Sequence, residues 1–165
     1  MVDDERTKRT MKKKTKFVVE PFDDIRIIGI NTGMLDYQLA WNLNKALKLN
    51  LVKYKDIISE DEDSFSFFLY DAGENSNAYN LVALSNEEAR WVSFSPQTDY
   101  LLIIRNYIKD DDFQSILTKI KSIPKVIYAY AVDLGKNSKI DTILEDIEMH
   151  EMEICNEINK KTSLF

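Results

Sequence analysis

The sequence is poor in the residues that form cross-links, bind metals and cradle phosphates. Its 165 residues include one cysteine, one histidine and four glycines. A lone cysteine, Cys155, cannot form an intramolecular disulfide or a cysteine-rich zinc site, and it favours a reducing cytoplasm as the location. A lone histidine, His150, excludes a histidine-based metal site. Neither the G-x-G-x-x-G nor the Walker A pattern occurs, so we expect no cofactor.

Recognised catalytic combinations are missing as well. His150 has no nucleophile elbow near it, and we interpret it as a packed or half-exposed side chain. The 28 acidic residues offer carboxylate pairs by chance alone. The acidic run at 60–63 lacks the glycine and the spaced ligands of a calcium loop. The sequence therefore predicts no catalytic residues and no metal site, and it indicates that the protein is not an enzyme.

Long apolar runs are absent, and this bears on location. No run approaches the ~20 residues that a membrane-spanning helix needs. The apolar stretch at 17–19 is too short for the core of a signal peptide behind the preceding lysines. We therefore expect a soluble cytoplasmic protein that has no membrane partner.

Charge is distributed unevenly along the chain. The formal net charge is −6, yet residues 1–16 hold seven Lys or Arg against three Asp or Glu. We interpret 1–16 as a disordered basic tail, within which Met11 is a second candidate start. The rest of the chain is acidic, which makes nucleic acid an unlikely partner because binding it depends on neutralising phosphates.

The clearest structural signal is a strand, a helix and a second strand. Residues 101–104 form an unbroken apolar run typical of a central strand buried on both faces. The acidic triplet 110–112 then favours the start of a helix, and Pro124 ends it. Four apolar residues of this helix share one face: Phe113, Ile116, Leu117 and Ile120. The second strand covers 126–132.

These signals together predict an α+β fold with a largely antiparallel sheet. We expect one domain over 17–135, in which helices starting near Leu35 and Asp111 cover the sheet. Segment 51–62 is expected to be a connection that ends in an acidic loop. The β-α-β-β…β-α-β order resembles ferredoxin-like and ACT-type domains. The expected strands are 25–30, 64–70, 78–84, 90–94, 100–107 and 126–132.

A C-terminal amphipathic helix is expected over 136–165. It should either pack on its own domain or pair with a second copy, since a helix of this composition is marginal alone. Its apolar stripe comprises Ile140, Ile143, Leu144, Ile147, Ile154 and Ile158. Its exposed acidic residues are expected to be Glu145, Asp146, Glu148, Glu151 and Glu153.

The helix near Leu35 carries the only candidate interaction face. Its core face is predicted from Leu35, Leu39, Leu43, Ala46 and Leu47. A second line lies roughly opposite and consists of Tyr37, Trp41, Asn44 and Lys48. Either the C-terminal helix or segment 51–58 covers this line, or the line is offered to a partner. Tyrosine and tryptophan are the residues that most often carry binding energy at interfaces.

Segment 92–100, with Val92, Asp99 and Tyr100, resembles the signature of the bacterial IPExxxVDY family, whose members have no assigned function. The signature maps onto 92–100, where Val92, Asp99 and Tyr100 match in kind, while Pro96 is displaced from the family's position. Segments 36–44 and 65–70 and the Leu-Phe ending support the resemblance, which covers 22–134 and the last residues. It implies a shared fold and no substrate.

Two functions from different classes fit these observations. The first is a protein-interaction module that displays the Tyr37/Trp41 line or the C-terminal helix to a protein partner or a second copy. The second is a small-molecule-binding regulatory domain of the ACT-like type, which rests on an analogy of fold.

Overall fold

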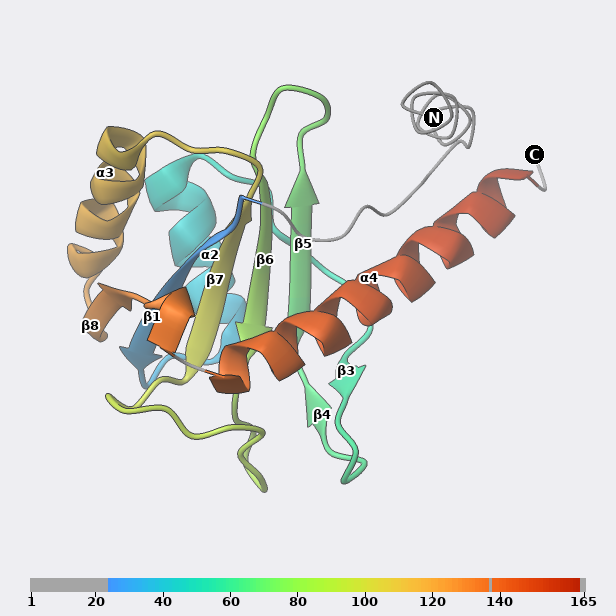
Figure 1. Cartoon of the computed structure of the whole chain (residues 1–165), viewed down its shortest axis with the longest axis horizontal. Coiled ribbons are helices and arrows are strands. Elements are labelled where there is room, and N and C mark those ends of the chain that lie inside the picture. The colour runs from blue at the N-terminus through green and yellow to red at the C-terminus, as the bar shows by residue number, and fades with distance from the viewer. Residues whose placement is uncertain (1–23, 137, 164–165) are drawn as a thin grey trace, which may run out of the picture.

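The computed structural model describes residues 24–136 and 138–163. The basic tail expected at 1–16 and the last two residues lie outside them. The described chain is an α+β domain with helices on both faces of a six-stranded sheet (Figure 1). In chain order the elements are β1 (Arg26–Thr32), α2 (Asp36–Leu47), β2 (Val52–Lys53), β3 (Ile57–Ile58), β4 (Ser64–Phe65), β5 (Phe67–Asp71), β6 (Ala78–Ala83), β7 (Tyr100–Arg105), α3 (Asp110–Lys121), β8 (Val126–Ala131), the short 3-10 helix η1 (Leu134–Lys136) and α4 (Ser138–Ser163).

The strand order is β2-β5-β6-β7-β1-β8, and every neighbouring pair is antiparallel. Strands β7 and β8 both pair with β1, so they run parallel to each other with β1 between them. The four strands β8-β1-β7-β6, with α2 and α3, form the predicted ferredoxin-like arrangement. Strands β5 and β2 extend the sheet beyond β6, while β3 and β4 form a separate two-stranded sheet.

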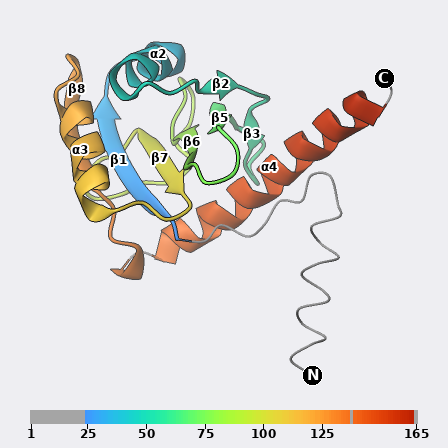
Figure 2. The same ribbon diagram turned by 90° about the horizontal axis from the view of Figure 1, so that it is seen from above.

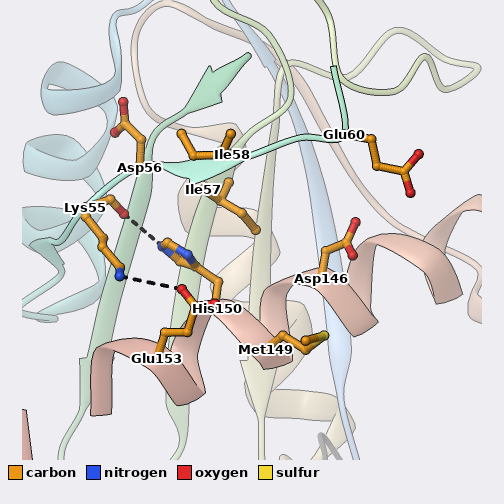
Figure 3. A pocket seen from close by; sticks show the side chains of 9 residues that line it. All are labelled: Lys55, Asp56, Ile57, Ile58, Glu60, Asp146, Met149, His150 and Glu153. Carbon is orange, nitrogen blue, oxygen red and sulfur yellow. Dashed lines mark hydrogen bonds and ion pairs between the residues drawn. The ribbon is translucent and has the colours of Figure 1, made fainter. Parts of the chain in front are cut away.

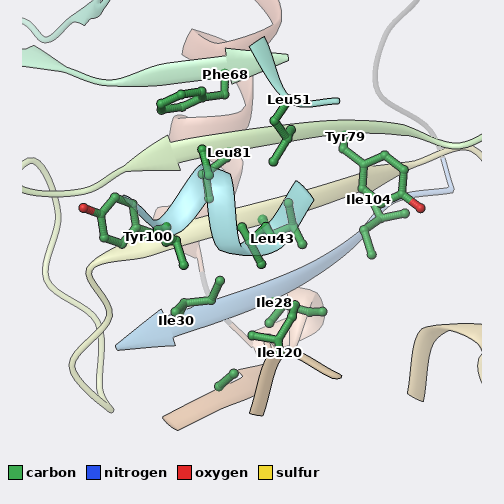
Figure 4. Packing of buried hydrophobic residues seen from close by; sticks show 14 of the residues in the cluster. Ile28, Ile30, Leu43, Leu51, Phe68, Tyr79, Leu81, Tyr100, Ile104 and Ile120 are labelled. Atoms are coloured by element: carbon green, nitrogen blue, oxygen red, sulfur yellow. The ribbon is translucent and has the colours of Figure 1, made fainter. Parts of the chain in front are cut away.

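One hydrophobic core lies between the sheet and helices α2 and α3. Leu43 of α2 and Ile120 of α3 cluster with residues from five strands, among them Ile28, Leu81 and Ile104 (Figure 4). The stripe predicted for α3 is confirmed: Phe113, Leu117 and Ile120 are buried, and Ile116 is partly buried against the same core. This core places α2 and α3 side by side on one face of the sheet.

The opposite face of the sheet is covered by α4 (Figure 2). Its isoleucines, among them Ile143 and Ile147, cluster with Ile27, Leu101 and Ile103. The C-terminal helix therefore packs on its own domain, which was one of the two predicted possibilities. Ile158, expected on the same stripe, is partly exposed, and the C-terminal end of α4 extends beyond the sheet (Figure 1). With a core on each side, the first five residues of β7 are buried.

Three expectations about the middle of the chain are wrong. Residues 90–94 form no strand and contribute only the isolated bridge between Ser85 and Arg90. They cannot enter the sheet because β6 and β7 already pair with each other, from Ala78 with Arg105 to Ala83 with Tyr100. Segment 51–62 includes two short strands, β2 and β3, and the strand expected at 64–70 is divided into β4 and β5 at Ser66.

Within residues 24–136 and 138–163, no helix combines the length and the apolar character needed to span a bilayer.

Candidate interaction groove

Helix α2 buries one face and leaves the other in solvent. Leu39, Ala40 and Leu43 are buried, as their spacing predicts. Leu35, expected on the same face, is 52% exposed. It precedes the first helical turn with an extended backbone, so it does not follow the helical stripe. The helix ends at Leu47, and the C-cap residue Lys48 has a left-handed backbone with a φ of 56°.

Both aromatic side chains of the predicted face project into solvent. Tyr37 and Trp41 are each 61% exposed. The sequence allowed two segments to cover these side chains, the C-terminal helix or segment 51–58. Neither segment covers them. Helix α4 lies on the other face of the sheet (Figure 2), and Leu51 packs into the core beside α2. Two large aromatics on one exposed helix face make this face a candidate contact surface.

Asn44 and Lys48 do not join the aromatic pair. The Asn44 side chain donates to the Leu51 carbonyl over 3.3 Å and accepts from the Leu51 N–H over 2.8 Å. It therefore fixes the turn that follows α2. Lys48 is exposed at the end of the helix. Of the four predicted residues, only Tyr37 and Trp41 line a common hollow.

This hollow is part of a groove between α2 and the end of α3. One hollow, of about 700 Å³, is lined by Met34, Tyr37, Gln38, Trp41, Asn42, Pro124 and Lys125. The next, of about 500 Å³, is lined by Asn42, Lys45, Ala46, Thr118, Lys119, Ser122, Ile123 and Pro124. They share Asn42 and Pro124, and we call them together the α2–α3 groove. The Lys45 ammonium lies 4.9 Å from the centre of the Trp41 ring, within range of a cation–π contact.

Thr32 joins the two walls of the groove. Its hydroxyl accepts a hydrogen bond from the Met34 N–H over 3.2 Å and donates one to the Lys125 carbonyl over 2.7 Å. Met34 precedes α2 and Lys125 precedes β8. The buried Thr32 side chain, 93 positions before Lys125 in the chain, therefore holds both segments. The groove is therefore a preformed feature of the fold.

Asp99 and Tyr100, two of the residues that match the family signature, support the same junction from behind. The Asp99 carboxylate accepts from the Thr32 N–H and from Arg90, each over 3.1 Å. The Tyr100 hydroxyl donates to the Met34 carbonyl over 2.9 Å. Burial raises the pKa of Tyr100 to about 12, so the phenol stays protonated and can donate near neutral pH.

The start of α2 is tied to the sheet by Asp36. Its carboxylate accepts hydrogen bonds from Ser66 over 2.5 Å and from Lys53 over 3.0 Å. Burial opposes its ionisation, but these hydrogen bonds outweigh burial and hold the pKa of Asp36 below its usual range. Asp36 thus fixes the helix turn that presents Tyr37.

A separate hollow, of about 320 Å³, lies outside the groove, between β3 and α4 (Figure 3). The Nε2–H of His150 donates to the Lys55 carbonyl over 2.9 Å, and the ring packs edge-on against Phe67. The predicted packed histidine is confirmed. Lys55 is itself bound by Glu153 and Glu157. Burial, with the charges of Glu60 and Glu145, raises the pKa of Asp146 at the rim. These polar groups are largely satisfied within the chain.

The described part of the chain brings together no three His, Cys, Asp or Glu side chains that could hold a metal ion.

A buried polar cluster beneath α4 was missed by sequence reasoning. Glu151, expected to be exposed, is buried against the sheet. Its carboxylate lies 2.9 Å from Nη1 of Arg105 and accepts from Asn80 over 2.8 Å. Burial raises the pKa of Glu151, although Arg105 and Asn80 favour its charged form. No local signal marks it, because its partners lie 46 and 71 residues away.

Comparisons with known proteins assign no family. No protein-family model matches the chain, and no curated protein matches it. The resemblance to the IPExxxVDY family therefore stays a prediction. The fold and the groove define an α+β domain with a preformed, partly apolar groove on one face.

Proposed function

We propose that the protein is an interaction module that binds a partner protein through the α2–α3 groove. The observation that carries the proposal is the exposure of Tyr37 and Trp41, each 61% exposed beside a hollow of about 700 Å³. Exposed tryptophan and tyrosine are the commonest interface anchors, and their burial by a partner would release water from a large apolar area.

The surroundings of the aromatic pair support binding rather than catalysis. Gln38 and Asn42 supply amide groups at the edge of the hollow, as a polar rim would require. Thr32 and Tyr100 hold Met34 in place, so little ordering of the groove is needed when a partner binds. The groove-lining residues of the described chain include no histidine, cysteine or carboxylate.

The test compares two exposed aromatic residues, one inside the groove and one outside it. Trp41→Ala removes the proposed anchor, whereas Tyr107→Ala removes an exposed aromatic side chain outside the groove. Proteins captured from a cell extract by the wild-type chain are purified and measured again by calorimetry. We expect one that binds the wild type and Tyr107→Ala alike but loses affinity for Trp41→Ala, with unfolding temperatures unchanged. Equal affinity for all three chains would contradict the proposal.

A small-molecule-binding regulatory domain is the second candidate. The observation in its favour is the volume of the same hollow, about 700 Å³, which lies within the range of small-ligand sites. A thermal-shift screen against amino acids and nucleotides tests it. A stabilising ligand whose effect disappears in Trp41→Ala would favour this candidate over a protein partner.

A further inference from the structure

The α2–α3 groove has a charge opposite to that of the chain as a whole. The formal net charge is −6, yet three lysines line the groove and no aspartate or glutamate does. The lysines come from three elements of the fold: Lys45 from α2, Lys119 from α3 and Lys125 from the turn before β8. A groove that gathers one sign of charge attracts ligands of the other sign.

These three lysines are not neutralised within the described residues. Lys53 and Lys55 form ion pairs with Asp36 and with Glu153 and Glu157, respectively. No described carboxylate forms such a pair with Lys45, Lys119 or Lys125. Lys45 lies against the Trp41 ring instead, so positive charge adjoins the apolar anchor directly.

We propose that the groove binds an acidic segment of a partner protein that carries a bulky apolar side chain. The apolar side chain would occupy the hollow beside Met34, Tyr37 and Trp41, while carboxylates would meet the lysines. This inference rests on the proposed function and adds the chemistry of the partner. Nucleic acid fits less well, because a chain with a net charge of −6 would repel a long phosphate backbone.

A displayed library of random peptides, selected on the full chain, provides the test. The selected peptides are synthesised, and their affinity is measured for the wild type, Trp41→Ala, the pair Lys45→Glu with Lys119→Glu, and Lys109→Glu. Lys109 precedes α3 outside the groove, so Lys109→Glu reports the effect of charge alone. The oligonucleotide dT20 is measured in parallel.

We expect selected peptides to combine Asp or Glu with a large apolar residue. Their affinity should fall at least about tenfold in Trp41→Ala and in the double lysine variant, decrease with added salt, and change little in Lys109→Glu. Peptides that need Trp41 but show no acidic preference and no loss in the lysine variant would overturn this inference and leave the proposed function standing. Failure to select any Trp41-dependent peptide would overturn both, and tighter lysine-dependent binding of dT20 would overturn the choice of a protein partner.

Discussion

Tyr100 belongs to the core and to the groove at once. Its ring packs in the cluster between the sheet and the helices, and its hydroxyl donates to the Met34 carbonyl over 2.9 Å. Groove geometry is therefore linked to β7 by one hydrogen bond. Asp99 and Tyr100 do not line the groove. They hold Thr32 and Met34 in place behind it through hydrogen bonds.

Tyr100→Phe should keep the packing and lose this bond. Removing the donor leaves the buried Met34 carbonyl unpaired, so the free energy of unfolding should fall by about 1 to 2 kcal/mol. Urea unfolding measures the change. Tyr107→Phe, at a side chain that is 73% exposed, is the control and should have almost no effect. Equal stability of the two variants would mean that the bond contributes nothing.

Glu151 should be the acidic residue whose removal costs the most stability. Glu151→Ala removes the carboxylate that forms a buried ion pair with Arg105, so we expect a loss of about 3 kcal/mol. Glu153 lies two residues later on the same helix and is exposed. Glu153→Ala breaks only an exposed pair with Lys55 and should change stability by less than about 1 kcal/mol. Chemical denaturation of both variants provides the comparison.

At the scale of elements, α4 is an integral layer of the fold. Ile147 is buried against the sheet, whereas Met149, two residues later, is 64% exposed. Ile147→Ala should therefore reduce the free energy of unfolding by about 2 to 4 kcal/mol, because it opens a cavity between α4 and β7. Met149→Ala should stay within about 0.5 kcal/mol. A similar small loss in both would show that α4 packs only loosely.

Elements with strong local patterns could be predicted from the sequence. The apolar run of β7, the acidic start of α3 and the isoleucine stripe of α4 each fix an element by themselves. Residues 90–94 have the composition of a strand, but the sequence does not reveal that β6 and β7 leave no open edge for them. Whether a segment with strand-like composition forms a strand depends on a free neighbouring strand, and strands that pair can be distant in the chain.

Only one of the two walls of the groove could be predicted from the sequence. Helical spacing places Tyr37 and Trp41 together, so α2 supplies a wall that the sequence reveals. The opposite wall includes Lys119 and Pro124, which follow α2 in the chain only after strands β2 to β7. The sheet brings this wall beside α2. Asn44 shares the spacing of the aromatics but turns to Leu51, because an amide satisfies the backbone there.

At the scale of the whole molecule, stability should fall above pH 9. Burial, together with the charge of Glu151, raises the pKa of the Cys155 thiol from 9.0 to about 11. Between these values the unfolded chain releases the proton and the folded chain retains it, so unfolding becomes easier as the pH rises. At pH 10.5 the ionisation of Cys155 should lower the free energy of unfolding by about 2 kcal/mol.

Urea unfolding of the wild type and of Cys155→Ala at pH 8 and pH 10.5 measures this contribution. Part of the alkaline loss should remain in the variant, because burial also raises the pKa of Tyr100 to about 12. The variant should nevertheless lose less stability than the wild type between the two pH values. An identical loss in both chains would show that the thiol ionises equally in the folded and unfolded states.

The two tryptophans of the chain have opposite surroundings. Trp41 stands in solvent on α2, whereas Trp91 is half-buried and stacked on Phe65 at 5.5 Å, on the far side of the sheet. Indole fluorescence shifts to shorter wavelength when water is excluded from the ring. An unlabelled sample therefore carries two optical reporters: emission from Trp41 follows occupancy of the groove, and emission from Trp91 follows the integrity of the layer beneath α4.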